Sequence, residues 1–186
     1  ALKVYSNEDN ALANRCLDFE KTSNTMIVGE AAACLSLSLS SEKAIAKITG
    51  IGFATEILSS STSISTEAEC FQKSMKMALQ DTDVAAVDVV VMHAPGTIKG
   101  DLTEYRAIEK IFGESLPLLT TNKWKIGHTF GASGILSFEL AILMLQHNQF
   151  VGVPFAKVQT QTKPIRKVLV NAVGFGGNAV SILLAI

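Results

Sequence analysis

The stretch VVVMHAPGTIKGD, residues 89–101, indicates the fold class of this chain. A run of apolar, mostly β-branched residues ends at His93, and an Ala-Pro-Gly turn follows it. β-branched residues favour strands, whereas Pro and Gly end them, so the pattern predicts a buried strand over residues 87–93. Open α/β sheets place their ligands at the carboxyl ends of strands. His93, a side chain that titrates near neutral pH, is therefore a candidate site residue.

Helix signals lie on both sides of this strand. Upstream, apolar residues four positions apart predict a helix over about 67–80, and Thr66 with Glu69 forms a capping pattern at its start. Downstream, the sequence predicts a helix over 102–112 and a long helix over 131–147 that is apolar on nearly all sides and therefore deeply buried. The apolar positions are Phe71, Met75 and Leu79 in the first helix and Tyr105, Ile108 and Phe112 in the second.

Further strand signals complete the pattern. Leu and Ser alternate in the second half of residues 27–39, and residues 44–56 alternate as well, so the two segments are predicted to pair as a ribbon. Residues 117–122 form a short strand, and residues 168–186 form two strands joined at the glycine-rich turn GFGG, 174–177. Strands that alternate with helices and end in a strand pair indicate an α/β fold, in which a mixed β-sheet is packed with helices in layers.

The bulk composition narrows the class of protein. The 186 residues are 48% apolar and 18% charged, which fits one globular domain over residues 1–186. A net charge of −1 without a basic cluster argues against a nucleic-acid partner. The sequence contains no run of about 18 uninterrupted apolar residues, so it predicts no membrane span. Cys16, Cys34 and Cys70 show no CxxC spacing, so we expect free thiols and a cytoplasmic location.

Three stretches are candidates for chemistry: His93, the segment NKWKIGHTFGASG over residues 122–134, and the GFGG turn. Each has an ordinary structural interpretation: a satisfied histidine, a tightly packed helix start and a hairpin turn. Together they are less ordinary, because His93 and His128 both end buried elements beside glycine-rich turns. His147 is explained by a favourable position at a helix carboxyl end.

A metal site is disfavoured, since zinc needs three or four ligands and no third Cys or His comes at a suitable spacing. Two neutral imidazoles that donate N–H groups to one oxyanion fit the pattern better.

These motifs resemble one family. HAPGTIKGD resembles the H-G-T-G-T-x-x-G-D segment of β-ketoacyl-acyl carrier protein synthases, NKWKIGHTFGASG resembles their K-x-x-x-G-H-x-x-G-A-A-G segment, and NAVGFGGNA resembles their N-S-F-G-F-G-G-T-N segment. The opening RCLDFEKTSNTMIVGEAAA is similar to R-P-F-D-x-x-R-D-G-F-V-x-G-E-G-A, with Arg15, Asp18, Gly29 and Glu30 kept. The motifs occur in family order, and the resemblance implies the carboxyl-terminal half of a thiolase-like ketosynthase.

The resemblance also implies an activity, which is the decarboxylative Claisen condensation of an acyl group with malonyl-acyl carrier protein in fatty-acid or polyketide synthesis. The implied catalytic residues are His93, His128 and Lys123, and the implied substrate-binding residues are Thr97, Phe175, Gly176 and Gly177. No metal and no resident cofactor are implied, because the substrates ride on the phosphopantetheine arm of acyl carrier protein. The implied partners are acyl carrier protein and the missing N-terminal half, in a homodimer or heterodimer when complete.

Departures from the family pattern leave an alternative open. The nucleophilic cysteine of the family lies on a strand-to-helix elbow, and none of the three cysteines here has that setting, so we expect this chain alone to be inactive. Pro95, Ser137 and Val173 stand where the family has threonine, glutamate and phenylalanine. The alternative is a non-catalytic partner subunit of the chain-length-factor type.

Overall fold

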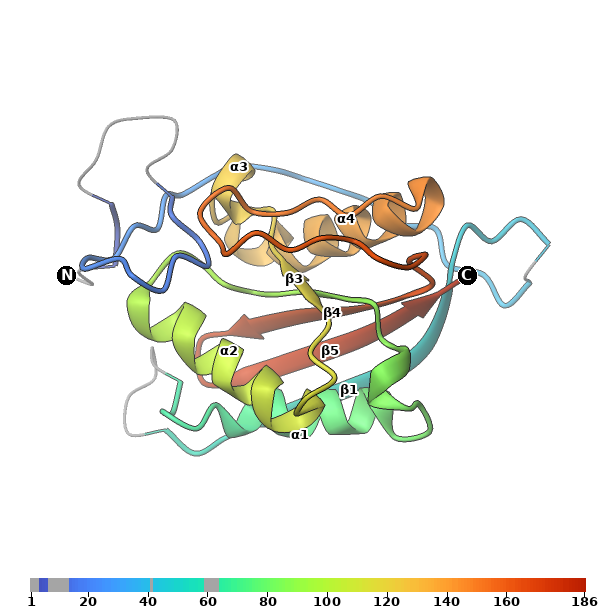
Figure 1. Ribbon diagram of the computed structural model, residues 1–186, viewed down its shortest axis with the longest axis horizontal. Coiled ribbons are helices and arrows are strands. Elements are labelled where there is room, and N and C mark those ends of the chain that lie inside the picture. The colour runs from blue at the N-terminus through green and yellow to red at the C-terminus, as the bar shows by residue number, and fades with distance from the viewer. Residues whose placement is uncertain (1–3, 7–13, 41, 59–63) are drawn as a thin grey trace.

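The apolar run around Val90 forms an inner strand of one mixed sheet (Figure 1). The computed structural model describes residues 4–6, 14–40, 42–58 and 64–186. The strand order is β1 (Lys47–Thr55), β5 (Asn178–Ala185), β4 (Lys167–Gly174), β2 (Val89–Val91) and β3 (Leu118–Thr120). β2 runs parallel to β3 and β4, whereas β5 runs antiparallel to β4 and β1.

Helices cover both faces of this sheet (Figure 1). α1 (Glu69–Leu79) and α2 (Ile98–Phe112) lie on one face, and α4 (Ser133–His147) lies on the other. Two 3₁₀ turns (Val84–Ala86 and Phe130–Ala132) and the one-turn helix α3 (Lys123–Ile126) connect these elements. Successive strand side chains point to opposite faces. Val90, Leu169 and Leu183 accordingly pack towards α1 and α2, whereas Val89, Val91, Val168 and Val170 pack towards α4.

Glycines let α1 lie unusually close to β1. A Cβ atom built on Gly50 would lie 1.9 Å from the carbonyl oxygen of Ala78, and one built on Gly52 would lie 1.9 Å from that of Ser74. Since Gly50 and Gly52 face α1, Ile51 and Phe53 must face the opposite side of the sheet.

The predicted layered α/β arrangement is confirmed, but the predicted ribbon is wrong. Residues 29–39 form no strand, and β1 pairs with β5 instead. Just before this segment, Met26 and Val28 make isolated bridges, to Tyr5 and His128 respectively. Alternation of Leu and Ser indicates only that side chains point to opposite sides of an extended chain. A strand also needs a backbone partner. For β1, that partner along its whole length is β5.

The predicted capping pattern at the start of α1 is also wrong. The helix begins at Glu69 after Ala68, which has a left-handed backbone and makes no side-chain cap. The carboxylate of Glu56, just beyond β1, instead accepts hydrogen bonds from the backbone N–H groups of Cys70 (3.3 Å) and Ser65 (2.8 Å). A negative charge at a helix amino end is favourable, and here it comes from a remote segment.

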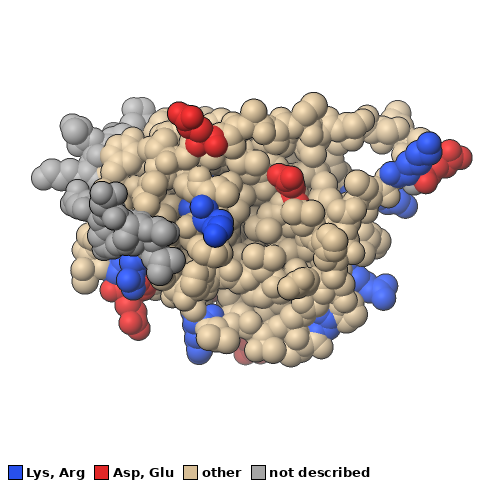
Figure 2. Space-filling model, turned by 90° about the horizontal axis from the view of Figure 1, so that it is seen from above, with Lys and Arg blue, Asp and Glu red and all other residues tan. Residues whose placement is uncertain are grey.

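α4 is only half buried, contrary to the prediction of a deeply buried helix. Six of its fifteen residues are buried, and Leu143 is 43% exposed. Ile51 and Phe53 on the same side of the sheet are 53% and 66% exposed. We call this surface of α4, Ile51 and Phe53 the open face. Figure 2, which views the molecule from the α4 side, shows few charged side chains there.

Among the described residues, one helical stretch, 130–147, is long and apolar enough to cross a membrane by length and composition alone. One third of it is buried inside the fold.

Candidate functional site

His93 directly follows β2 and is held by its backbone. Its N–H group donates to one carboxylate oxygen of Glu104 on α2 (2.9 Å), and the N–H group of Ala94 donates to the other (2.9 Å). The backbone N–H group of Val173, in β4, donates to His93 Nδ1 at 3.4 Å. The imidazole, 7% exposed, therefore has a fixed position at the end of the parallel strands.

His128 follows α3 and joins the site from a second segment. Its backbone N–H group donates to the carbonyl of Ile27 (2.7 Å), and its own carbonyl accepts from Gly29 (3.1 Å). His128 Nδ1 lies 2.9 Å from Ser133 Oγ, and it accepts the N–H group of Phe130 at 3.3 Å. The Phe130 ring stacks on the imidazole, with 4.9 Å between centroids.

The two imidazole rings meet edge to face, with centroids 5.1 Å apart and planes at 85°. The predicted proximity of the histidine pair is therefore confirmed. Each Nδ1 atom accepts a backbone N–H group, so the neutral form of each ring carries its proton on Nε2. Both rings thus have an Nε2–H group available for donation.

The surroundings keep both rings neutral. Burial, then the nearby Lys123 ammonium and His128, place the pKa of His93 well below its ordinary value. Burial and the Lys123 ammonium lower the pKa of His128 to about 4. Since desolvation and a neighbouring positive charge both disfavour the imidazolium, the pair is neutral at physiological pH.

Lys123 brings a buried positive charge to this pair. The residue is 1% exposed, and its Nζ atom has no hydrogen-bond partner among residues 4–6, 14–40, 42–58 and 64–186. Burial lowers the pKa of Lys123, whereas Cys16, Glu104 and Asp101 act in the opposite direction. An unpaired buried ammonium costs free energy, so Lys123 is a candidate functional residue.

One irregular segment contacts the three segments that carry His93, Lys123 and His128. We call residues 14–29 the strap. Asn14 donates to the carbonyl of Lys123 (2.8 Å), and Thr25 donates through its backbone N–H group (2.9 Å) and hydroxyl (2.8 Å) to the carbonyl of Gly96. Lys21 forms a buried ion pair with Asp101 (2.6 Å), and Asp101 also accepts from the N–H group of Gly96. The strap therefore fixes the segments that carry His93, Lys123 and His128 relative to one another.

The remaining predicted residues lie outside the buried cluster. Thr97 is the N-cap of α2, and its hydroxyl accepts from the N–H group of Gly100 (3.1 Å). Phe175 is 65% exposed in the turn between β4 and β5. Gly176 and Gly177 follow it with φ angles of 85° and 70°, which favour glycine, so they shape this turn.

None of the chain's three cysteines, all of which lie in described segments, has the environment of a nucleophile. Burial and Asp101 raise the pKa of the Cys16 thiol, and burial and Glu56 raise that of Cys70 to about 12. Cys34 is exposed in the irregular segment before β1. Catalytic thiolates require lowered pKa values, so the buried thiols are structural.

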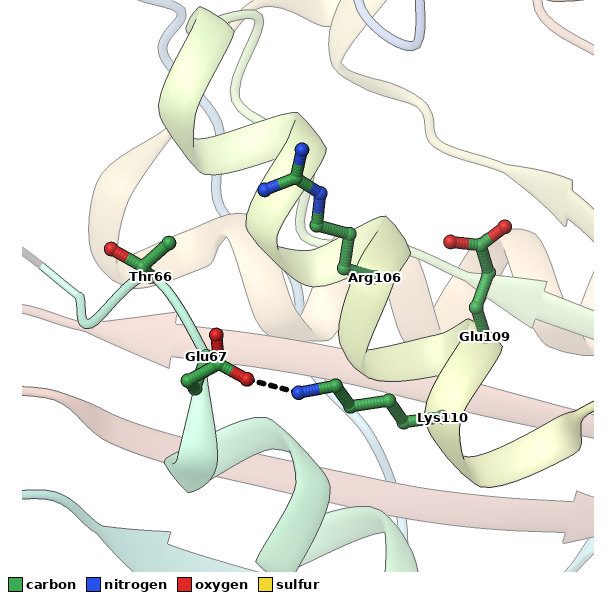
Figure 3. A pocket seen from close by; sticks show the side chains of 5 residues that line it. All are labelled: Thr66, Glu67, Arg106, Glu109 and Lys110. Atoms are coloured by element: carbon green, nitrogen blue, oxygen red, sulfur yellow. Dashed lines mark hydrogen bonds and ion pairs between the residues drawn. The ribbon is translucent and has the colours of Figure 1, made fainter.

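A hollow of about 270 Å³ lies elsewhere, between the start of α1 and α2 (Figure 3). Side chains of both charge signs line it, and Lys110 and Glu67 pair across it. The lining residues are Thr66, Glu67, Arg106, Glu109 and Lys110. The lining is exposed to solvent and carries both charge signs. None of its five residues is an acid, base or nucleophile in a buried environment like that of the histidine pair.

The family described as Beta-ketoacyl synthase, C-terminal domain, matches residues 45–155. This chain belongs to that family. The ketosynthase domain is 28% identical over 123 residues to 3-oxoacyl-[acyl-carrier-protein] synthase 1 of Escherichia coli, in an alignment that covers 59% of this chain and 30% of that protein. It is 27% identical to 3-oxoacyl-[acyl-carrier-protein] synthase 2 of Coxiella burnetii, with 100% of this chain and 50% of that protein covered. The chain thus spans half the length of these relatives or less.

Solved structures confirm the thiolase-like ketosynthase fold of this domain. A type II polyketide ketosynthase, solved in complex with its acyl-carrier protein, superposes with a TM-score of 0.78 at 16% identity, covering 99% of this chain and 50% of that one. A ketosynthase from Xenorhabdus doucetiae, solved with its chain length factor, superposes with a TM-score of 0.69 at 24% identity, covering 78% of this chain and 40% of that one.

Sequence reasoning missed the residues that hold the histidine pair and Lys123 in place. Glu104 fixes the His93 turn, Asn171 donates to Glu104 (3.2 Å), and Asn14 binds the Lys123 carbonyl. One signal was available for Glu104, because it lies four residues before Ile108 on the apolar face of α2. Asn14 and Asn171 carry no comparable local signal.

Proposed function

We propose that this domain supplies the histidine pair of a condensing enzyme that performs decarboxylative Claisen condensation. The observation that carries the proposal is the pair of neutral imidazoles, 5.1 Å apart, each with Nδ1 occupied by a backbone N–H group. Two Nε2–H donors can then stabilise one oxyanion without giving up their protons. The buried Lys123 ammonium adds positive charge where negative charge develops.

The reaction proceeds in two steps. The bond between the malonyl carboxylate and the α-carbon breaks, carbon dioxide leaves, and the electron pair moves onto the thioester oxygen as an enolate. His93 and His128 donate to this oxygen. The enolate carbon then attacks an acyl thioester on cysteine, and the cysteine thiolate leaves as the new carbon–carbon bond forms.

The acylated cysteine comes from outside this chain in the proposed enzyme. Burial raises the pKa of the Cys16 and Cys70 thiols, which disfavours them as nucleophiles. We propose that an N-terminal ketosynthase half supplies the cysteine and covers the open face. Acyl carrier protein delivers both substrates on its phosphopantetheine arm, past Thr97, Phe175, Gly176 and Gly177. No resident metal or cofactor takes part in this scheme, and its setting is the cytoplasm.

A second candidate function is a non-catalytic partner of the chain-length-factor type. Two of the structural neighbours are complexes between a ketosynthase and a chain length factor, which favours this class. Pro95 and Ser137, which replace polar family residues, also favour it. A scaffold, however, has no physical use for an unpaired buried ammonium beside two neutral histidines.

One experiment separates the two functions. The domain is assembled with its partner half, and release of carbon dioxide from malonyl-acyl carrier protein is measured for the wild type, His93→Ala and His128→Ala. The condensing enzyme predicts a loss of about 100-fold or more in each variant, because each removes one oxyanion donor. His147→Ala, at the exposed end of α4, is the matched control and keeps the wild-type rate. Equal rates in all four proteins would favour the scaffold.

A further inference from the structure

One polar side chain of the strap, Asn14, contacts both the segment of Lys123 and the turn after His93. Asn14 is 2% exposed, although it carries a carboxamide. Its Nδ2 atom donates to the carbonyl of Lys123 at 2.8 Å. Its Oδ1 atom accepts from Cys16 Sγ at 3.1 Å, which fixes the orientation of the carboxamide.

The same carboxamide lies directly against Gly96 in the turn after His93. A Cβ atom built on Gly96 would lie 2.1 Å from Asn14 Oδ1, so only glycine leaves room there. Gly96 has a φ angle of 95°, which also favours glycine. Asn14 therefore links the Lys123 segment to the His93 segment through one close contact and one hydrogen bond.

Asn14 holds Lys123 through the backbone carbonyl oxygen of that residue. This oxygen accepts the N–H group of Gly127, which ends α3, and the carboxamide of Asn14. Lys123 stands at the first position of a helix of only four residues, which has little stability of its own. A side-chain donor from the strap supplies the missing restraint on its backbone.

We propose that Asn14 is a positioning residue that holds the Lys123 ammonium beside the histidine pair. Its part in catalysis rests on the proposed function, but its effect on the site does not. Without the Asn14 bond, the first residue of α3 loses its hydrogen bond to the strap, whereas the backbone bonds of His128 to Ile27 and Gly29 remain. The Lys123 ammonium then moves towards solvent, since nothing among the described residues hydrogen-bonds it inside the fold.

The electrostatics of the cluster provide a readout specific to this role. Lys123 on α3 acts on both histidines, and His128 acts on His93. Cys16 on the strap and Glu104 and Asp101 on α2 act on Lys123. Lys123 lowers the pKa of both histidines. Its displacement raises these values. Hydration of the rings in a loosened fold would raise them too, because burial is the larger cause, so a control variant on the strap must measure that contribution.

The test is an NMR titration of the histidine side chains in the complete protein that contains this chain, comparing the wild type with Asn14→Ala. We expect the pKa of His128 to rise by about one unit in Asn14→Ala. Asn14→Ser, which fits the space but is too short to reach the carbonyl, should give the same shift and serves if the alanine variant does not fold. Asn24→Ala is the matched control, because Asn24 also lies on the strap but binds the N–H group of Ile98 at the start of α2.

The inference is overturned if the His128 pKa of the Asn14 variants equals that of the wild type, or if Asn24→Ala shifts it equally. Decarboxylation of malonyl-acyl carrier protein is measured on the same proteins. A fall of about 10-fold in kcat in the Asn14 variants, with KM nearly unchanged, extends the role to catalysis. If the Asn14 variants shift the His128 pKa but the wild type releases no carbon dioxide, the proposed function is rejected and the positioning role stands.

Discussion

At the scale of single residues, Glu104 shows how a buried carboxylate can build a site without taking part in its chemistry. Its two oxygens accept the N–H groups of His93 and Ala94, and Asn171 donates to it from β4. Asn171 is itself bound by Ser181, which contacts Ser74 on α1 (2.8 Å). Burial raises the pKa of Glu104. The cost of burying this group is offset by the three donors that surround it.

Replacing Glu104 with alanine should destabilise the fold by roughly 3 kcal/mol or more, because three buried donors lose their acceptor and a cavity remains. Urea unfolding followed by circular dichroism measures this change. Glu109→Ala, an exposed position on the same helix, is the control, and it should change the free energy of unfolding by about 0.5 kcal/mol or less. Equal stability of the two variants would show that Glu104 does not hold the His93 turn.

His128 should titrate far below an ordinary histidine. Its pKa of about 4 lies below the value near 6.5 expected in the unfolded chain, so the unfolded state takes up a proton first as the pH falls. The stability contributed by the neutral ring is thus present above pH 6.5 and is lost as the pH falls from 6.5 towards 4. NMR titration should give a low pKa in the wild type and a higher one in Lys123→Met, which removes the buried ammonium. A wild-type value near 6.5 would contradict the burial and charge described for this ring.

The sequence predicted the candidate site only where the local pattern carries the information. His93 and His128 end buried elements beside glycine turns, and that local signal was enough to predict their proximity. Asn14 contacts Lys123 across 109 positions, so no local pattern could reveal the contact. Thr97 was predicted to bind substrate from its motif, but its position also makes it a helix cap, and the motif alone cannot separate the two roles.

At the scale of elements, the prediction failed where a partner had to be chosen. Alternation occurs in the second half of residues 27–39 and in residues 44–56, and the sequence predicts that these two neighbours pair. β1 instead pairs with β5, the last strand of the chain. Alternation predicts that a segment is extended, whereas the partner is decided by which edge of the sheet remains free. Helices were predicted more securely, because a helix makes its backbone hydrogen bonds within itself.

The contact between α1 and β1 should tolerate no side chain at Gly52. In Gly52→Ala the new methyl group would lie 1.9 Å from the carbonyl oxygen of Ser74, so α1 must move away from the sheet. We expect a loss of about 1–3 kcal/mol in the free energy of unfolding, measured by denaturant titration. Gly131→Ala is the control, since nothing lies within 4 Å of its Cβ position. A Gly52→Ala protein as stable as the control would contradict this packing.

At the scale of the whole molecule, the fold buries an apolar cluster on each face of the sheet yet leaves apolar side chains exposed on one side. α4 packs on β2 and β4, while Ile51 and Phe53 on the neighbouring part of the sheet remain more than half exposed. Soluble proteins rarely expose contiguous apolar patches of this kind without a partner. The chain spans half the length of the curated relatives it matches, or less.

The isolated chain should therefore self-associate and bind an apolar dye. Light scattering and dye fluorescence measure the two effects, and Phe53→Lys with Leu143→Lys should reduce both, because charges on the open face disfavour its burial. Val158→Lys, an exposed apolar position in the loop before β4, is the control and should change neither. A strictly monomeric, dye-silent wild-type chain would contradict the role given to the open face.

The strap has a consequence for the order in which the chain acquires its structure. Its hydrogen bonds join residues 71, 84 and 109 positions apart, from Thr25 to Gly96, Leu17 to Asp101 and Asn14 to Lys123. Closing such long loops costs entropy before any contact repays it, so these bonds form slowly. We expect pulsed hydrogen exchange during refolding to protect α1 and α2, whose backbone bonds are local, before the N–H groups of Leu17, Thr25 and His128. The histidine pair would then acquire its final geometry only after the helices have formed.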